Sequence, residues 1–191
     1  MNVIFQILTR IRNLLLFTEK EWRLIAAENN NRKTVYLRFV LPWLCLITIA
    51  TIIGTWLATQ RDVYSAGYVI SWITTLWATF STGLYFSSFV ITEIMVHQVG
   101  SRDHNQSFTL MAYSLGAAYS VIFIVALFPI FYELLVLAFY AFYLYWRGIP
   151  YLIGVGGQKR MIYGLLSFII TMLAHLLMFF FFGKIFRAIL I

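Results

Sequence analysis

The chain has 191 residues, of which 62% are hydrophobic and 11% charged, with a mean hydropathy of +0.84 and a formal charge of +7. Soluble domains average about 45–50% apolar and about 25% charged residues, so this composition excludes an ordinary soluble fold. Half of the 14 Lys and Arg residues lie in the first 38 positions, which favours an anionic lipid surface over nucleic acid as the partner of the positive charge. Cys45 is the only cysteine, which excludes an intrachain disulfide and a CxxC metal or redox site.

Residues 1–35 are predicted to form a cytoplasmic segment of amphipathic, interfacial helices. Apolar side chains recur at helical spacing at Ile4, Ile7, Leu8, Ile11, Leu14 and Leu15. Arg10 and Arg12 interrupt the apolar run and no small-residue cleavage site follows, so the segment is not a signal peptide. The pattern predicts a helix on the membrane surface or, alternatively, a helix packed on the protein's own cytoplasmic face.

A second short helix is predicted to begin at Thr18. The pair Thr18 and Glu21 has the form of a capping box, in which an N-cap hydroxyl precedes a glutamate by three residues. Trp22 and Ile25 would then point toward the membrane or the bundle. The run Asn29-Asn30-Asn31 should end this helix, because asparagine side chains compete for the helical backbone hydrogen bonds.

Residues 36–191 are predicted to form an all-α bundle of about five transmembrane helices. A span needs about 20 predominantly apolar residues, and such runs lie at about 39–57, 68–96, 108–128, 130–146 and 162–182. Pro129 makes a tight turn between the third and fourth spans, because one merged helix would bury it in mid-helix. A turn at Arg147-Gly148-Ile149-Pro150 and a glycine-rich basic loop should follow the fourth span.

The distribution of Lys and Arg residues predicts the orientation. With five spans and the N-terminus inside, 11 of the 14 fall on inner segments. The positive-inside rule then places the N-terminus in the cytoplasm and the C-terminus outside. Contacts with lipid headgroups are expected from Arg10, Arg12, Lys20, Arg32, Lys33, Arg147, Lys159 and Arg160.

Two ridges of small residues predict close helix packing. Ser71, Thr75, Thr79, Gly83 and Ser87 repeat every four residues in the second span. The third span carries Ala112, Gly116 and Ser120 at the same interval. Small residues let transmembrane helices approach closely, so the two ridges are predicted to pack on each other. A polar path between the helices is the functional alternative.

Ionisable residues within spans are costly and therefore mark functional candidates. Glu93 and His97 share a helical face at the end of the second span, and His104 follows in the next loop. Together they offer ligands to a divalent metal, although solvated loop residues explain them equally well. Glu133 and His175 should reach similar depth in the fourth and fifth spans, where they would form an intramembrane polar pair.

Motifs for catalysis are missing from the sequence. No HExxH, serine-nucleophile motif or dinucleotide fingerprint occurs, and the glycine-rich stretch at 154–159 lacks the GK[ST] ending of a phosphate loop. These observations predict a protein that is not an enzyme and has no cofactor.

The order of several motifs resembles the bacterial branch of the Yip1 family, which are small five-span membrane proteins. The resemblance covers the chain from residue 4 and rests on Phe17-Thr18-Glu19-Lys20-Glu21-Trp22, Leu41-Pro42-Trp43-Leu44, Met111-Ala112-Tyr113-Ser114 and Gly148-Ile149-Pro150-Tyr151-Leu152. It implies a five-span fold in the bacterial cytoplasmic membrane and supplies no active site. The proline that commonly follows the third-span Tyr-Ser pair is absent here.

Two functions are therefore expected from the sequence. The leading one is a non-enzymatic membrane protein that binds membrane or peripheral protein partners or organises the bilayer, with homo-oligomers as an option. The alternative is a small ion, metal or lipid transporter or channel whose path uses Glu93, His97, Glu133 and His175.

Overall fold

The computed structural model describes residues 3–57, 66–99 and 103–190, and all the regular secondary structure in this part of the chain is helical. The elements in chain order are α1 (Val3–Leu16), α2 (Thr18–Glu28), α3 (Arg32–Val35), the π-helical η1 (Tyr36–Val40), α4 (Leu41–Leu57), α5 (Ala66–Val99), α6 (His104–Ser114), α7 (Gly116–Leu127), the 3-10 helical η2 (Pro129–Phe139), α8 (Tyr140–Leu152) and α9 (Gly157–Leu190). The prediction of an all-α fold is confirmed.

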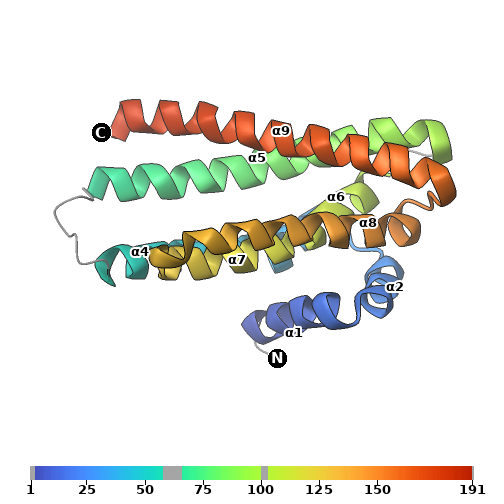
Figure 1. Ribbon diagram of the computed structural model, residues 1–191, viewed down its shortest axis with the longest axis horizontal. Coiled ribbons are helices and arrows are strands. Elements are labelled where there is room, and N and C mark those ends of the chain that lie inside the picture. Colours follow the sequence, from blue (N-terminus) through green and yellow to red (C-terminus); the bar gives the residue numbers. More distant parts are fainter. Residues whose placement is uncertain (1–2, 58–65, 100–102, 191) are drawn as a thin grey trace.

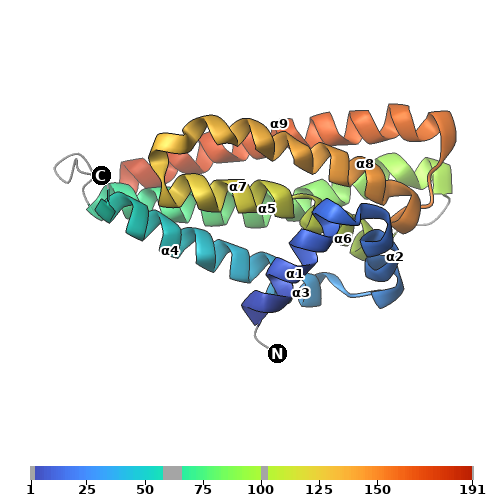
Figure 2. The same cartoon turned by 60° about the horizontal axis from the view of Figure 1, so that its bottom comes forward.

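The helices form three layers (Figure 1). Helices α5 and α9 lie side by side along the whole bundle, and α4, α7 and η2–α8 form the layer beneath them. The short helices α1 and α2 cover the far side of that second layer. We call α1 and α2, residues 3–28, the cap. The C-terminus lies at the end of the bundle opposite α2 (Figures 1 and 2).

Four helical segments are long and apolar enough to cross a membrane. They are Arg32–Leu57, His104–Leu127, Pro129–Leu152 and Arg160–Leu190. Helix α5 contains the remaining predicted span, 68–96, but its many Ser, Thr and Tyr residues lower its hydropathy. A protein with several transmembrane helices is therefore supported, and the passage of α5 through the bilayer stays a prediction.

The turn at Pro129 has the predicted place, whereas the turn after the fourth span does not. Helix α7 ends at Leu127 and η2 begins at Pro129, where the missing N–H costs no hydrogen bond. Helix α8, however, continues through Arg147-Gly148-Ile149-Pro150 to Leu152, and the chain turns at 153–156. Pro150 has no N–H to donate to the carbonyl of Trp146, so the last turn of α8 lacks one hydrogen bond and the helix ends two residues later.

The predicted capping box at Thr18 is not formed. Thr18 is the first residue of α2, and its hydroxyl donates a hydrogen bond of 2.7 Å to the carbonyl of Leu14. Glu21 is free for a different contact, described below. The predicted end of α2 is confirmed, because the helix stops at Glu28 and Asn29 takes a left-handed conformation with φ 43°.

The ridge of small residues on α5 packs on α9 rather than on the third span. The imidazole of His175 on α9 lies directly over Gly83, where a Cβ would clash with the ring. Gly116 of the third-span ridge instead receives Ile11 and Phe39, from α1 and η1. The sequence pattern identified the close-packed faces correctly, but each face has a different partner from the one predicted.

Hydrogen bonds between side chains connect the remaining helices. Trp77 of α5 donates to Thr48 of α4 at 2.8 Å, and the hydroxyls of Tyr145 on α8 and Ser167 on α9 are 2.5 Å apart. Such bonds contribute about 0.6 kcal/mol each inside a membrane. The helices are therefore held by packing, with these bonds fixing their register.

Candidate functional site

The candidate site lies where the cap meets the bundle. Helix α1 buries Ile7, Ile11 and Leu14, which are spaced by four and three residues and so share one face. Ile11 lies against Gly116 at the start of α7. This packing corresponds to the alternative prediction of a helix on the protein's own surface.

Helix α2 is anchored by a large aromatic side chain. Trp22 is fully buried, and its indole ring lies against Gly148 of α8, where any side chain would clash with it. Ile25, one turn further along α2, is also buried. The buried side chains of the cap are therefore part of the hydrophobic core, and the cap packs directly on the bundle.

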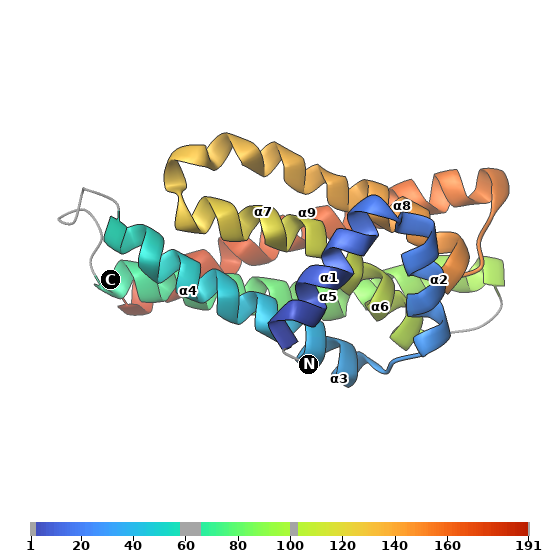
Figure 3. The ribbon, with the colours of Figure 1, turned by 90° about the horizontal axis from the view of Figure 1, so that it is seen from below.

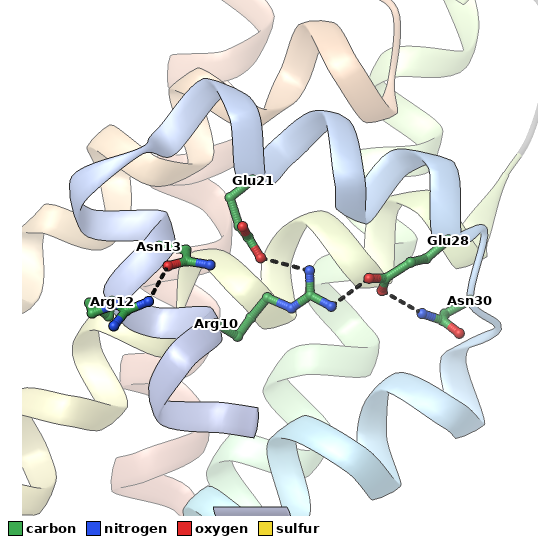
Figure 4. Close-up of polar contacts among 6 residues, drawn as sticks. All are labelled: Arg10, Arg12, Asn13, Glu21, Glu28 and Asn30. Atoms are coloured by element: carbon green, nitrogen blue, oxygen red, sulfur yellow. Dashed lines mark hydrogen bonds and ion pairs between the residues drawn. The ribbon is translucent and has the colours of Figure 1, made fainter. Parts of the chain in front are cut away.

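An ion cluster joins the two helices of the cap (Figure 4). The guanidinium of Arg10 donates to the carboxylates of Glu21 at 2.7 Å and Glu28 at 2.5 Å. It also lies 5.7 Å from the centre of the Tyr113 ring. Glu28 accepts a further hydrogen bond of 3.0 Å from the Asn30 amide. One arginine thus bridges α1, both ends of α2 and α6.

Burial and charge set the electrostatics of this cluster. The side chains of Arg10 and Glu21 are 23% and 5% exposed, so their attraction is only partly screened by solvent. Burial alone lowers the pKa of Arg10, but the hydrogen bond and the negative charge of Glu28 outweigh it, and the net pKa is raised. Arg10 therefore stays protonated, and the cluster of one cation and two carboxylates carries a net negative charge.

A cleft of about 750 Å³ opens beside the cluster, between α1, α2 and the segment Thr34–Phe39. Its walls combine both signs of charge, from Arg10, Arg38, Glu21 and Glu28, with the apolar side chains of Phe5 and Leu24. Because charged and apolar groups alternate in it, the cleft suits an extended peptide or a lipid headgroup better than a small apolar molecule.

The outer surface of α1 has a second apolar face. Phe5, Leu8, Leu15 and Leu16 are all at least 40% exposed, and they surround the exposed Arg12. At 100° per residue these positions cover the side next to the buried face, while Gln6, Thr9, Arg10 and Asn13 face the cleft. Helix α1 therefore has three distinct faces, of which the apolar one formed by Leu8, Leu15 and Leu16 is exposed in the described structure.

Two contacts fasten α2 to α8. Arg147 of α8 forms an ion pair with Glu19, and Arg23 of α2 lies 5.8 Å from the centre of the Tyr151 ring. Figure 3 shows α2 beside the end of α8, with α1 crossing the bundle obliquely. Both contacts are at the surface, and surface ion pairs typically contribute less than about 1 kcal/mol.

The cations expected at the lipid surface divide into two groups. Arg12, Lys20, Arg32 and Lys33 are exposed as expected. Arg10 is turned inward to its two carboxylates, Arg147 is paired with Glu19, and Arg160 lies 4.7 Å from the centre of the Trp146 ring. The side chain of Lys159 lies outside the described residues.

The proposed metal ligands are not assembled into a site in the described part of the chain. Glu93 is partly buried on α5, and the ring of His104 stacks on Phe89 with 6.2 Å between the ring centres. The side chain of His97 lies outside the described residues. Elsewhere in those residues, no three His, Cys, Asp or Glu side chains gather closely enough to hold a metal.

Glu133 and His175 are not brought together. Glu133 is exposed on η2, an element without a buried residue. His175 lies between α9 and α5, and its Nδ1 is 2.8 Å from the carbonyl of Thr171. The polar pair was expected from equal depth in the bilayer, but depth says nothing about which faces of two helices meet.

The cluster of Arg10, Glu21 and Glu28 was missed by the sequence analysis. The available signal was the seven-residue spacing of Glu21 and Glu28, which places both carboxylates on the face of α2 that also carries Ile25. Acidic residues on an apolar helix face need a cation, and Arg10 on the preceding helix supplies it.

The chain matches no family model, no curated protein and no solved structure.

Proposed function

We propose that the protein is a non-enzymatic, multi-pass membrane protein of the Yip1 type that organises the cytoplasmic surface of a bacterial membrane through its cap. The observation that carries this proposal is the exposed apolar face of α1, next to exposed Arg12 and Lys20. A helix with an apolar face and flanking cations binds the boundary between headgroups and acyl chains.

The length of the helices supports the position of the cap. Helices α5 and α9 have 34 residues each, or about 51 Å, whereas the hydrocarbon core of a bilayer is about 30 Å thick. The excess length of α5 and α9 lies at the end of the bundle that carries α2 and α6, because α4 begins well short of that end. Helix α1 lies near the level where α4 begins, and this is where the inner headgroups would be.

The test is the depth of α1 in a bilayer. In a Cys45→Ser background, an environment-sensitive fluorophore would be attached to cysteines replacing Leu8 or Leu16, with Asn29→Cys, just after the cap, as the exposed control. Brominated lipids should quench the fluorophore at positions 8 and 16 strongly and at position 29 weakly. Equal, weak quenching at all three positions would contradict the membrane role and would favour the cap as a binding surface for a peripheral protein.

A transporter or channel is the alternative, and one observation favours it. Thr79 Oγ, Ser87 Oγ and His175 Nε2 are buried at the α5–α9 contact without a hydrogen-bond partner in the described structure. Buried polar groups are usually paired, so unpaired ones mark sites of function or strain. In this case the transported ion would be a proton, and its passage would require His175.

A further inference from the structure

An apolar pocket of about 480 Å³ opens on the side of the bundle, toward the end that carries the C-terminus. It lies between α4, α5, α7, η2 and α9, and its lining includes Leu76, Phe80, Ile122, Val125 and Leu135. Binding pockets for small molecules have about 300–1,000 Å³. The pocket is therefore large enough to hold part of an elongated apolar molecule.

A smaller pocket of about 210 Å³ adjoins it between α5 and α9. The two pockets share Tyr68, Trp72 and Phe179 as lining residues. The smaller one also contains Lys184 and Arg187, which lie three residues apart and so on one face of α9. A pocket with a cationic end and an apolar pocket thus lie side by side, with Tyr68, Trp72 and Phe179 between them.

The charged residues that line this site are both cations, Lys184 and Arg187. Neither lining includes an Asp or Glu residue, and Arg187 lies 6.0 Å from the centre of the Tyr68 ring. Cations near the end of a helix are stabilised by its dipole even without a ligand, so the charges alone define no site. The adjoining apolar pocket is the second, independent observation.

We propose that the two pockets bind one phospholipid with an anionic headgroup. Its phosphate would lie at Lys184 and Arg187, which hold phosphate oxygens through charge-assisted hydrogen bonds, and an acyl chain would fill the larger pocket. A free anion leaves the apolar pocket unused, and a neutral hydrocarbon leaves the two cations unused. The proposal requires only that this end of the bundle lies in a bilayer, and it is independent of the role of the cap.

The experiment is native mass spectrometry of the detergent-purified protein with equal amounts of phosphatidylglycerol and phosphatidylcholine. The protein should retain one phosphatidylglycerol in preference. The double variant Lys184→Gln/Arg187→Gln should lose affinity for it by about 30-fold, since a cation at a membrane surface contributes about fivefold. The matched control Arg32→Gln/Lys33→Gln removes the same charge at exposed positions that line neither pocket, so the affinity for this one retained lipid should stay unchanged.

A second variant tests the apolar pocket. Leu135 lines it and is 45% exposed, so Leu135→Trp fills the pocket from its open side without disturbing the core. This variant should weaken phosphatidylglycerol binding while both cations remain, and Val69→Trp is the reserve if it does not fold. Equal lipid retention in all variants would overturn the proposal. Competition by glycerol phosphate as strong as competition by the whole lipid would also overturn the proposal. The depth of α1 should stay unchanged in every variant, which separates this test from that of the cap.

Discussion

Arg10 is the residue on which the cap depends most. Its guanidinium satisfies Glu21, whose side chain is only 5% exposed, and reaches Glu28 at the far end of α2. A carboxylate left buried without its cation costs about 1–3 kcal/mol or more. Removing Arg10 should therefore cost more than removing any surface cation of the cap.

We expect Arg10→Met to lower the free energy of local unfolding of the cap by about 2 kcal/mol, because Glu21 loses its partner. Hydrogen exchange of α1 and α2 measures this release, and the rest of the bundle should exchange as before. Arg12→Met is the matched control, since Arg12 is exposed and donates a hydrogen bond to its neighbour Asn13. Glu21→Gln combined with Arg10→Met should restore part of the loss. Equal exchange in both single variants would show that the cluster contributes nothing.

The charge of Arg10 is not a source of pH dependence in the usual range. Its folded-state pKa is raised, so the stability it contributes is present below the unfolded pKa and lost only as the pH rises through the folded one. Both pKa values lie far above the physiological pH range. The cluster should weaken with added salt, because its exposed part is screened.

At the scale of elements, the sequence predicted which segments are helical and which faces pack closely, but not the partners of those faces. The repeat of Thr75, Thr79 and Gly83 identified a close-packed face on α5, yet α9 covers it instead of the third span. Periodicity locates a face on one helix and carries no information on which helix will cover it. The turn predicted at Arg147-Gly148-Ile149-Pro150 was misplaced because α8 continues two residues past Pro150, and one missing N–H weakens a helix without ending it at that residue.

The α5–α9 contact carries the element-scale prediction. His175 fills the space over Gly83, so α5 and α9 are in close contact at this point. We therefore expect the purified protein in liposomes to conduct no protons, as measured with a trapped pH-sensitive dye. A proton flux that is lost in His175→Ala, but kept in the control His104→Ala, would contradict the leading proposal and support the transporter.

At the scale of the whole molecule, the composition was enough to predict an all-helical membrane protein. Four segments meet the length and hydropathy of a span, and α5 lies along α9 over its full length. The cap could be predicted as two helices, but its place on the bundle could not. That place depends on glycines in α7 and α8, Gly116 and Gly148, that receive Ile11 and Trp22.

We propose a topology in which five helices cross the membrane with the cap inside. Its most direct test is the accessibility of single cysteines in intact cells, in a Cys45→Ser background, to a reagent that does not cross membranes. Asn30→Cys, after the cap, should react only once the membrane is opened, whereas Ala188→Cys, at the end of α9, should react in intact cells. Reaction of both positions from the same side would contradict the account, because it would leave an even number of crossings.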